Sequence, residues 1–140
     1  MTLGYRHVLI ATDLAADDEG VLARGIELAR HYQAGMTLLH VVEYSSAVIA
    51  GDLLTPEDVT LDQERVTQAR QQLVELQQRL SVPEARIQVE LGVPKHEIVR
   101  VAGELGADLI VLGSHGRHGL QLLLGSTANG VLHLAKADVL

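Results

Sequence analysis

The fold of this chain follows from the segment Val8-Leu9-Ile10-Ala11, which leads directly into Thr12-Asp13. Its four residues are apolar and partly β-branched, and the polar pair Arg6-His7 stands in front of them. A short, continuous apolar run between polar residues is typical of a strand that is buried on both faces, as in a parallel sheet. We therefore expect helices to cover this strand from both sides.

Similar runs predict four more strands, with helices between them. The strands are expected at residues 36–42, 85–91, 108–112 and 138–140, and the helices after residue 17, from 56 to about 80, from 94, and from 126 to about 135. The first helix is expected to end at Gly35, because glycine often follows a helix C-terminus. Strands that alternate with helices are typical of βαβ units. The chain is thus predicted to be a single α/β domain, residues 1–140, with an open, doubly wound, parallel five-stranded sheet and helices on both faces.

Two of these elements carry further information. Residues 85–91 alternate apolar and polar side chains, which indicates an edge strand or a strand with one wetter face. In the long helix, five apolar residues recur at intervals of three and four: Val66, Ala69, Leu73, Leu76 and Leu80. Coiled coils share this spacing, but about two heptads are too few, so we expect an ordinary helix packed on the sheet.

Composition and charge exclude several classes of protein. The chain has 140 residues, 11 Lys and Arg against 18 Asp and Glu, a net charge of −7, three Tyr, and no Cys, Phe or Trp. The absence of cysteine excludes disulfides, thiolate zinc sites, iron–sulfur clusters and cysteine nucleophiles. The acidic charge and the few aromatic rings argue against nucleic-acid binding. Residues 1–7 do not resemble a signal peptide, and no apolar run approaches the ~20 residues of a membrane span, so we expect a cytoplasmic protein without membrane contact.

Ligands of open parallel sheets bind beyond the carboxyl ends of the strands, where the strand order reverses. Here those ends are Thr12-Asp13, Val41-Val42-Glu43 and the loop that begins at Gly113. The loop is rich in glycine, which lets a backbone approach a ligand closely, and it leads into a helix that starts at Ser126-Thr127. The N–H groups and the dipole at a helix start favour an anion, so this loop is predicted to be a phosphate cradle.

Known phosphate motifs do not fit this loop. Gly113, Gly116 and Gly119 are spaced GxxGxxG rather than the GxGxxG of dinucleotide-binding folds. No GxxxxGK[ST] occurs anywhere in the chain. P-loop NTPases and Rossmann dehydrogenases are therefore disfavoured.

The candidate residues also have plainer interpretations. Asp13 could close a turn or cap the next helix, and the loop glycines could serve as turns alone. His40, at a strand end, is expected to be packed or hydrogen-bonded rather than catalytic. His115 and His118 lack a neighbouring carboxylate and make a poor zinc site, because zinc usually needs three or four ligands. No GxSxG elbow accompanies Ser114-His115, and no paired carboxylates indicate acid–base catalysis.

The loop resembles the nucleotide-binding signature of the universal stress protein family, with Gly113-Ser114-His115-Gly116, eight residues, and then Gly125-Ser126. Matching segments occur in the same order along the rest of the chain: Ala11-Thr12-Asp13-Leu14, Leu39-His40-Val41, Gly92-Val93-Pro94 and Ala107-Asp108-Leu109-Ile110-Val111. The resemblance implies the sheet order 3-2-1-4-5 and a stress-response protein that binds a small nucleotide (ATP) or acts as a signalling module. Family members usually form homodimers, often through their last strand, which here begins at Asp138.

The resemblance also implies roles for particular residues. In ATP-binding members, the position of Asp13 lies near the ribose or a metal ion, and the backbone at the position of Val41 contacts adenine. The first two glycines of the signature approach the ribose and phosphates, and its final Gly-Ser pair holds the phosphates. The predicted nucleotide site comprises Thr12, Asp13, Val41, Leu112, Gly113, Gly116, Arg117, Gly125, Ser126 and Thr127. No metal site is expected from the protein alone, and any ATP hydrolysis is expected to be weak.

One spacing differs from that of the ATP-binding members. Eight residues, 117–124, separate Gly116 from Gly125, one fewer than in those members. The shorter spacing is similar to that of the branch named for the founding bacterial stress protein, which lacks the glycines and is not regarded as an ATP binder. Two functions stay open: a module that binds ATP, with Mg²⁺ possible through Asp13, and a dimeric interaction module that binds no nucleotide.

Overall fold

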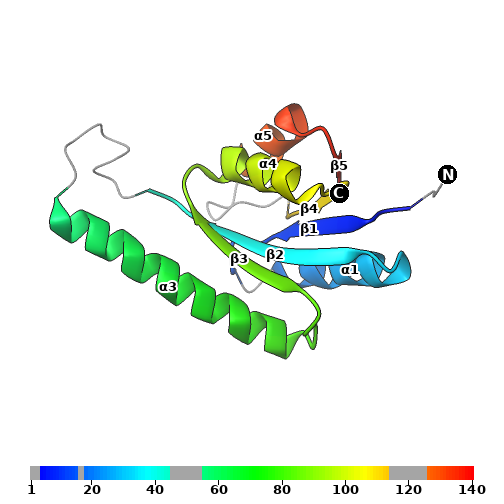
Figure 1. Cartoon of the computed structure of the whole chain (residues 1–140), viewed down its shortest axis with the longest axis horizontal. Helices are drawn as coiled ribbons and strands as arrows, with labels where there is room; N and C mark the ends of the chain where they lie inside the picture. The colour runs from blue at the N-terminus through cyan, green and yellow to red at the C-terminus, as the bar shows by residue number, and fades with distance from the viewer. Residues whose placement is uncertain (1–3, 16–17, 45–54, 114–125) are drawn as a thin grey trace.

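Five parallel strands form one sheet with the order β3-β2-β1-β4-β5, which confirms the predicted α/β fold and strand order (Figure 1). The computed structural model of the chain describes residues 4–15, 18–44, 55–113 and 126–140. The strands are β1 (His7–Ala11), β2 (Gly35–Val42), β3 (Arg86–Leu91), β4 (Leu109–Val111) and β5 (Asp138–Val139). The helices are α1 (Glu19–His31), α3 (Pro56–Arg79), α4 (Pro94–Leu105) and α5 (Ser126–Leu134). Each strand boundary lies within one residue of the predicted one, and β3 is an edge strand as its alternation indicates.

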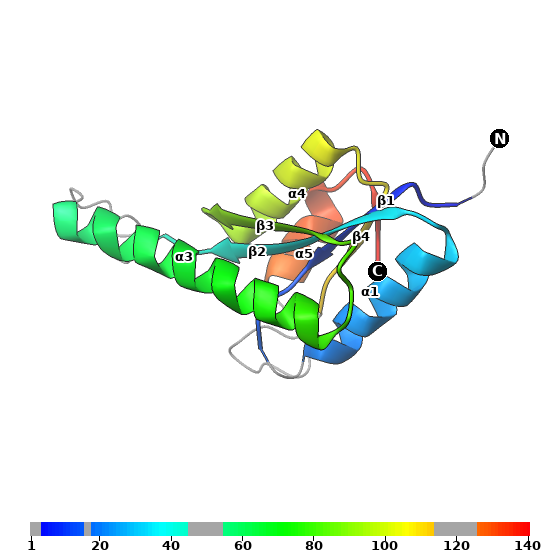
Figure 2. The same ribbon diagram turned by 60° about the horizontal axis from the view of Figure 1, so that its bottom comes forward.

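In the described part of the chain, two helices cover each face of the sheet. α1 and α3 lie on one side of it, and α4 and α5 lie on the other (Figures 1 and 2). The side chains of β1 alternate between these layers, because Val8 and Ile10 pack in the core under α1 and α3, whereas Leu9 and Ala11 pack under α4 and α5. Val8, Leu9 and Ile10 are each 0% exposed. β1 is therefore buried on both faces, as its apolar run predicts.

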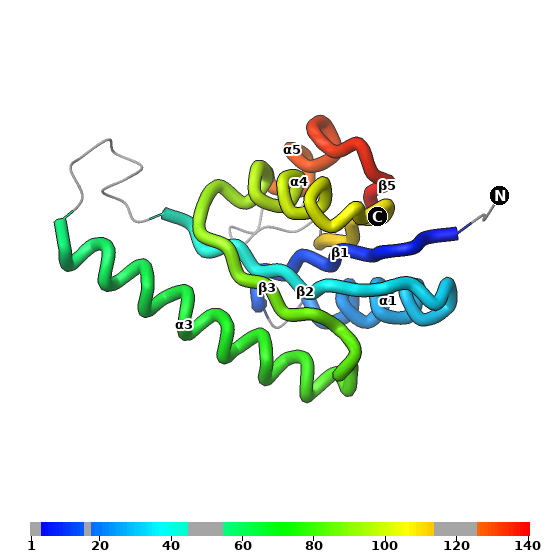
Figure 3. The backbone as a smooth tube through the Cα atoms, in the orientation of Figure 1, coloured from blue at the N-terminus to red at the C-terminus, as the bar shows by residue number. Residues whose placement is uncertain are grey.

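Helix α3 packs on β2 and β3 and extends beyond them. Its buried Ala69, Leu73 and Leu76 join the core on the α1 side of the sheet, which confirms an ordinary helix packed on a sheet. It begins at a capping box, in which Thr55 and Asp58 each accept a hydrogen bond from the other's backbone N–H. Its 24 residues span about 36 Å, against about 26 Å for the eight residues of β2, so its first turns project past the end of that strand (Figure 3). Neither α3 nor any other described helix is long and apolar enough to cross a membrane.

Helix α1 does not end at Gly35, so that prediction is wrong. It ends at His31, and Gln33 adopts a left-handed conformation with a φ of 54°. The N–H groups of Gln33 and Ala34 donate back to carbonyls of the last turn, which completes a Schellman motif. Gly35 instead begins β2 opposite His7, where a Cβ would lie 2.7 Å from the His7 Nδ1. Gly35 therefore starts β2 beside the His7 ring and does not end the helix.

Asp108 ties the start of β4 to the start of β1. Its carboxylate accepts hydrogen bonds from the Arg6 N–H at 2.9 Å and the His7 N–H at 3.1 Å. Burial opposes ionisation of the carboxyl, but hydrogen bonds from these two N–H groups and from its own outweigh burial and lower the pKa of Asp108. The tie therefore depends on the ionised form of Asp108.

We expect Gln33→Gly to raise the free energy of unfolding by about 0.5–1 kcal/mol, because glycine adopts a positive φ without the steric cost of a Cβ. Urea denaturation measures the change. Gln71→Gly, at an exposed position inside α3, is the matched control and should lower stability by about 1 kcal/mol. A Gln33→Gly protein no more stable than the wild type would contradict the left-handed conformation.

We expect Asp108→Asn to lower the free energy of unfolding by about 1 kcal/mol near neutral pH, because an amide cannot accept from both N–H groups without turning its own N–H₂ toward a donor. Since the folded pKa lies below the ordinary 3.8, the contribution of Asp108 is present above that pH and is lost as the pH falls through the folded pKa. Urea denaturation of both proteins from neutral pH to about pH 2.5 should show their difference shrinking in acid. A difference that stays constant with pH would argue against the tie.

Candidate functional site

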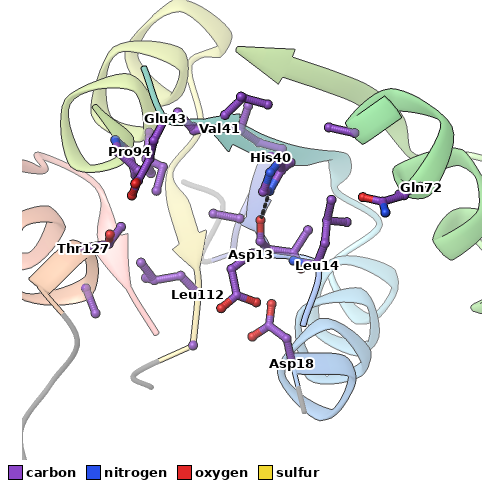
Figure 4. A pocket seen from close by; sticks show the side chains of 18 of the residues that line it. Asp13, Leu14, Asp18, His40, Val41, Glu43, Gln72, Pro94, Leu112 and Thr127 are labelled. Atoms are coloured by element: carbon purple, nitrogen blue, oxygen red, sulfur yellow. Dashed lines mark hydrogen bonds between the residues drawn. The ribbon is translucent and has the colours of Figure 1, made fainter. Parts of the chain in front are cut away.

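A pocket of about 580 Å³ lies at the carboxyl ends of β1, β2 and β4 (Figure 4). The loop after β1, one face of α3 and the starts of α4 and α5 complete its lining. The strand order reverses beside β1, because β2 and β3 lie on one side of it and β4 and β5 on the other. The pocket therefore occupies the position at which open parallel sheets bind their ligands.

The parallel strands bring together predicted site residues that are far apart in the sequence. The pocket is lined by Thr12, Asp13, Val41, Leu112, Gly113, Ser126 and Thr127. Three other predicted residues, Gly116, Arg117 and Gly125, lie outside the described residues, as do Ser114, His115 and His118.

After β1 the chain turns, and two side chains hold the turn. Thr12 Oγ1 accepts a hydrogen bond from the Leu14 N–H at 3.0 Å, and Asp13 Oδ1 accepts one from the Ala15 N–H at 2.9 Å. Leu14 has a positive φ of 65°, a conformation that residues with a side chain adopt rarely and that clusters at functional sites. The bond to Ala15 confirms that Asp13 closes a turn. The same carboxylate is directed into the pocket (Figure 4).

The backbone of β2 directs a donor and an acceptor toward the pocket. The backbone groups of Leu39 point toward β1, because its carbonyl accepts a hydrogen bond from the Thr12 N–H at 2.9 Å. Those of Val42 point toward β3, because its carbonyl accepts one from the Gly92 N–H at 2.9 Å. Successive residues of a central strand direct their backbone groups alternately to the two neighbouring strands, so the N–H and C=O of Val41 point to the side of β1. β1 has ended there, and Val41 lines the pocket. Val41 therefore presents a hydrogen-bond donor and an acceptor side by side.

The end of β4 and the start of α5 form another part of the pocket. Leu112 and Gly113 lead out of β4, and Ser126 and Thr127 begin α5. The first N–H groups of a helix have no partners within the helix and lie at the positive end of its dipole, so they favour an anion. A Cβ at Gly113 would lie 2.7 Å from Asp18 Oδ1, so a larger residue there would have to displace the Asp18 side chain. The Asp18 carboxylate thus lies against the backbone at the start of the glycine loop.

Arg65 of α3 connects that helix to the end of β2. Its Nη1 donates to the Glu43 carbonyl at 3.0 Å and to Asp62 Oδ1 at 3.1 Å. Asp62 is only 6% exposed, so its charge needs such a partner. Gln68 and Gln72 follow Arg65 along the same helix and line the pocket with it. α3 therefore closes one side of the pocket with polar side chains.

His40 lies in the pocket lining and is 7% exposed. Its Nδ1 is 2.8 Å from the carbonyl oxygen of Thr12. Because a carbonyl can only accept, the Nδ1 carries a proton and donates it. This bond confirms the prediction that His40 is a packed, hydrogen-bonded histidine.

The described side chains give the pocket more negative than positive charge. Asp13 and Asp18 direct their carboxylates into the same part of the pocket (Figure 4), and Glu43 adds a third acidic residue against the cation of Arg65. Within the described parts of the chain, no group of three or more His, Cys, Asp or Glu side chains gathers as a metal site. A divalent cation held here would need oxygen ligands from a bound molecule in addition to the carboxylates.

Among the polar residues of the pocket, four are not predicted from the sequence to lie there: Asp18, Arg65, Gln68 and Gln72. The position of Asp18 carries a signal, since it follows β1 closely and must lie near the carboxyl edge of the sheet. The α3 residues carry none. Glutamine and arginine in a long helix are typical of a solvated surface, and only the packing of α3 on the sheet shows that they reach the pocket.

Comparison with known proteins identifies the family. Residues 4–140 match the Universal stress protein family. The chain is 41% identical over 136 residues to "Universal stress protein A homolog 1" of Coxiella burnetii, an alignment that covers 97% of this chain and 94% of that protein. Its fold is similar to that of the universal stress protein UspA from Lactobacillus plantarum, with a TM-score of 0.83, 25% identity and coverage of 99% and 98% of the two chains.

A further solved structure, of a universal stress protein in complex with cAMP, has a TM-score of 0.63 and 20% identity and covers 99% of this chain and 96% of that chain. At this identity the similarity shows a shared fold. The match to the family over residues 4–140 and the 41% identity to the Coxiella burnetii protein also show common family membership. The chain belongs to the universal stress protein family.

Proposed function

We propose that this chain binds an adenine nucleotide, with ATP as the expected form, and acts as a nucleotide-binding or signalling module in the stress response. The observation that carries the proposal is the backbone donor and acceptor of Val41, which β2 presents in the same pocket as the start of α5. One part of the pocket suits the edge of a base, and another suits an anion.

The base would be recognised by the main chain. Adenine carries a ring nitrogen acceptor beside an amino donor, which match the N–H and C=O of Val41. Leu14 and Leu112, which are both partly exposed, line the pocket and offer aliphatic surface for the faces of the ring. No Phe, Tyr or Trp side chain lines the pocket within the described part of the chain, so binding of the base depends on hydrogen bonds and aliphatic packing.

The phosphates would bind at the start of α5 near Ser126. Asp13 and Asp18 would repel phosphates unless a cation lies between them. Mg²⁺ in proteins is usually bound by one or two carboxylates together with the phosphates of a nucleotide, so these two side chains fit it. Asp13 is the residue expected to hold Mg²⁺, which would neutralise phosphate charge. The structure in complex with cAMP supports the proposal, because it is a universal stress protein of this fold with an adenine nucleotide bound.

A second function, a dimeric interaction module that binds no nucleotide, is favoured by two observations. The relatives that are 41% and 38% identical are named as homologues of universal stress protein A. The glycine loop is also one residue shorter than in ATP-binding members. Nucleotide that copurifies with the protein would argue against this alternative.

Either function is compatible with a cytoplasmic homodimer. β5 is an outer strand that pairs only with β4 in the described sheet, so its other edge offers backbone groups to a partner. Sedimentation velocity measures the oligomeric state. ATP hydrolysis is expected to be weak at most, and turnover by the wild type should not exceed that of the Asp13→Asn protein.

We expect Asp13→Asn to weaken the affinity for Mg·ATP about tenfold or more, because asparagine keeps the oxygen that accepts from Ala15 N–H but has no charge for Mg²⁺. Affinity for AMP without Mg²⁺ should change less than about twofold. Isothermal titration calorimetry measures both, and Glu27→Gln, exposed on α1, is the matched control that should change neither. A wild type that shows no heat and no thermal stabilisation at millimolar ATP would overturn the proposed function.

We expect Ser126→Asp to separate helix stability from phosphate binding. An acidic residue in the first turn of α5 interacts favourably with the helix dipole, so the melting temperature should not fall. The same charge repels phosphates, so the affinity should fall progressively from AMP to ADP to ATP, by about tenfold or more for ATP. Ser126→Ala is the neutral control, and adenosine should bind both variants equally. A loss of the same size for all four ligands would contradict phosphate binding at α5.

A further inference from the structure

His40 connects a side chain of β2 to the backbone of the loop after β1. Its Nδ1–H donates to the Thr12 carbonyl at 2.8 Å, and the two residues are 7% and 6% exposed. In Figure 4 the dashed bond runs from His40 to the backbone just before Asp13. The bond uses a carbonyl that β1 would ordinarily offer to the neighbouring strand.

The strand register identifies the donor that would ordinarily use this carbonyl. β1 and β2 are parallel, with Ala11 opposite Leu39, and the Thr12 N–H donates to the Leu39 carbonyl at 2.9 Å. In a parallel ladder, the carbonyl of such a residue accepts from the N–H two positions further along the same partner strand. The regular donor to the Thr12 carbonyl is therefore the N–H of Val41. The ladder instead ends at the pair Ala11 and Leu39, and the imidazole of His40, the residue between, binds the Thr12 carbonyl.

We infer that His40 is a positioning residue, which binds the Thr12 carbonyl, ends the ladder between β1 and β2, and keeps the Val41 N–H directed into the pocket. The chain geometry after Thr12 agrees with this role. The Thr12 hydroxyl and the left-handed Leu14 turn the chain away from β2 at once, so no later residue of β1 replaces the lost ladder partner.

The consequence for the ligand rests on the proposed function. A Val41 N–H that points into the pocket can donate to the unprotonated ring nitrogen of adenine. Hypoxanthine carries a proton on that nitrogen and an oxygen in place of the amino group, so it presents the opposite pattern. His40 would therefore set the preference for adenine over hypoxanthine without touching the base.

Two variants of nearly equal size separate this role from simple packing. Asparagine at position 40 places an amide N–H where the Nδ1–H lies, whereas leucine fills the same space without a donor. His133→Leu, at an exposed position on α5, controls for the loss of a histidine. If His40→Leu does not fold, His40→Gln replaces it, because its amide reaches the position of Nε2 rather than Nδ1.

The first measurement needs no ligand. Amide hydrogen exchange, followed by NMR on the full chain, should show the Val41 N–H exchanging rapidly in the wild type, in His40→Asn and in His133→Leu. In His40→Leu the Thr12 carbonyl is released to the ladder, so exchange at Val41 should slow by about tenfold or more. Removal of the hydrogen bond between His40 and Thr12 should thus increase the protection of the Val41 amide from exchange. Equal exchange at Val41 in the wild type and His40→Leu would overturn it.

The second measurement is the ratio of affinities for ATP and inosine triphosphate, both as magnesium salts. We expect the wild type and His40→Asn to prefer ATP, and His40→Leu to lose about tenfold of that preference, with binding of inorganic tripolyphosphate unchanged. A purely structural role would lower all three affinities together, which would overturn the inference. If the wild type binds no nucleotide, the proposed function fails, whereas hydrogen exchange at Val41 still decides the role of His40.

Discussion

Strand β1 has to form hydrogen bonds along both edges and bury side chains on both faces, and the other elements are placed by these requirements. β2 pairs with one edge and β4 with the other. Val8 and Ile10 need the layer of α1 and α3, and Leu9 needs the layer of α4 and α5. Parallel strands also need long crossover connections, which the helices supply. Where β1 ends, β2 continues and still directs the backbone groups of Val41 toward the line of β1, and the pocket forms at that point.

The pocket therefore combines two kinds of chemistry with different origins. The groups that suit a base are backbone atoms of β2, fixed by the same register that holds the sheet together. The carboxylates of Asp13 and Asp18 come from the turn after β1 and the start of α1, where the chain is no longer bound by the ladder. Under the proposed function, a protein with a net charge of −7 would bind its nucleotide through helix N–H groups and a cation rather than through a basic surface.

The strands and the location of the pocket could be predicted from the sequence because both depend on short, local signals. A buried parallel strand such as 108–112 is a continuous apolar run, and its carboxyl end marks the ligand edge. The end of α1 was less predictable, because Gln33 adopts a conformation that favours glycine, while the nearby Gly35 already belongs to β2. The pocket residues of α3 and the bond from His40 to Thr12 depend on packing and register. No residue type or spacing in the sequence predicts these pocket residues or this bond before the strands are aligned.

The strand order also constrains how the chain is made. β1 leaves the ribosome first, yet β4, its partner on one edge, lies about 100 residues later in the chain. At ordinary rates of translation this delay lasts roughly 5–20 s, during which β1, β2, β3 and α3 can already associate. The edge of β1 that will become the middle of the sheet is then an unpaired, apolar strand edge, the kind that joins to other chains. During this interval, one edge of a strand that is central in the folded protein stays open to other chains, until residues 109–111 pair with it.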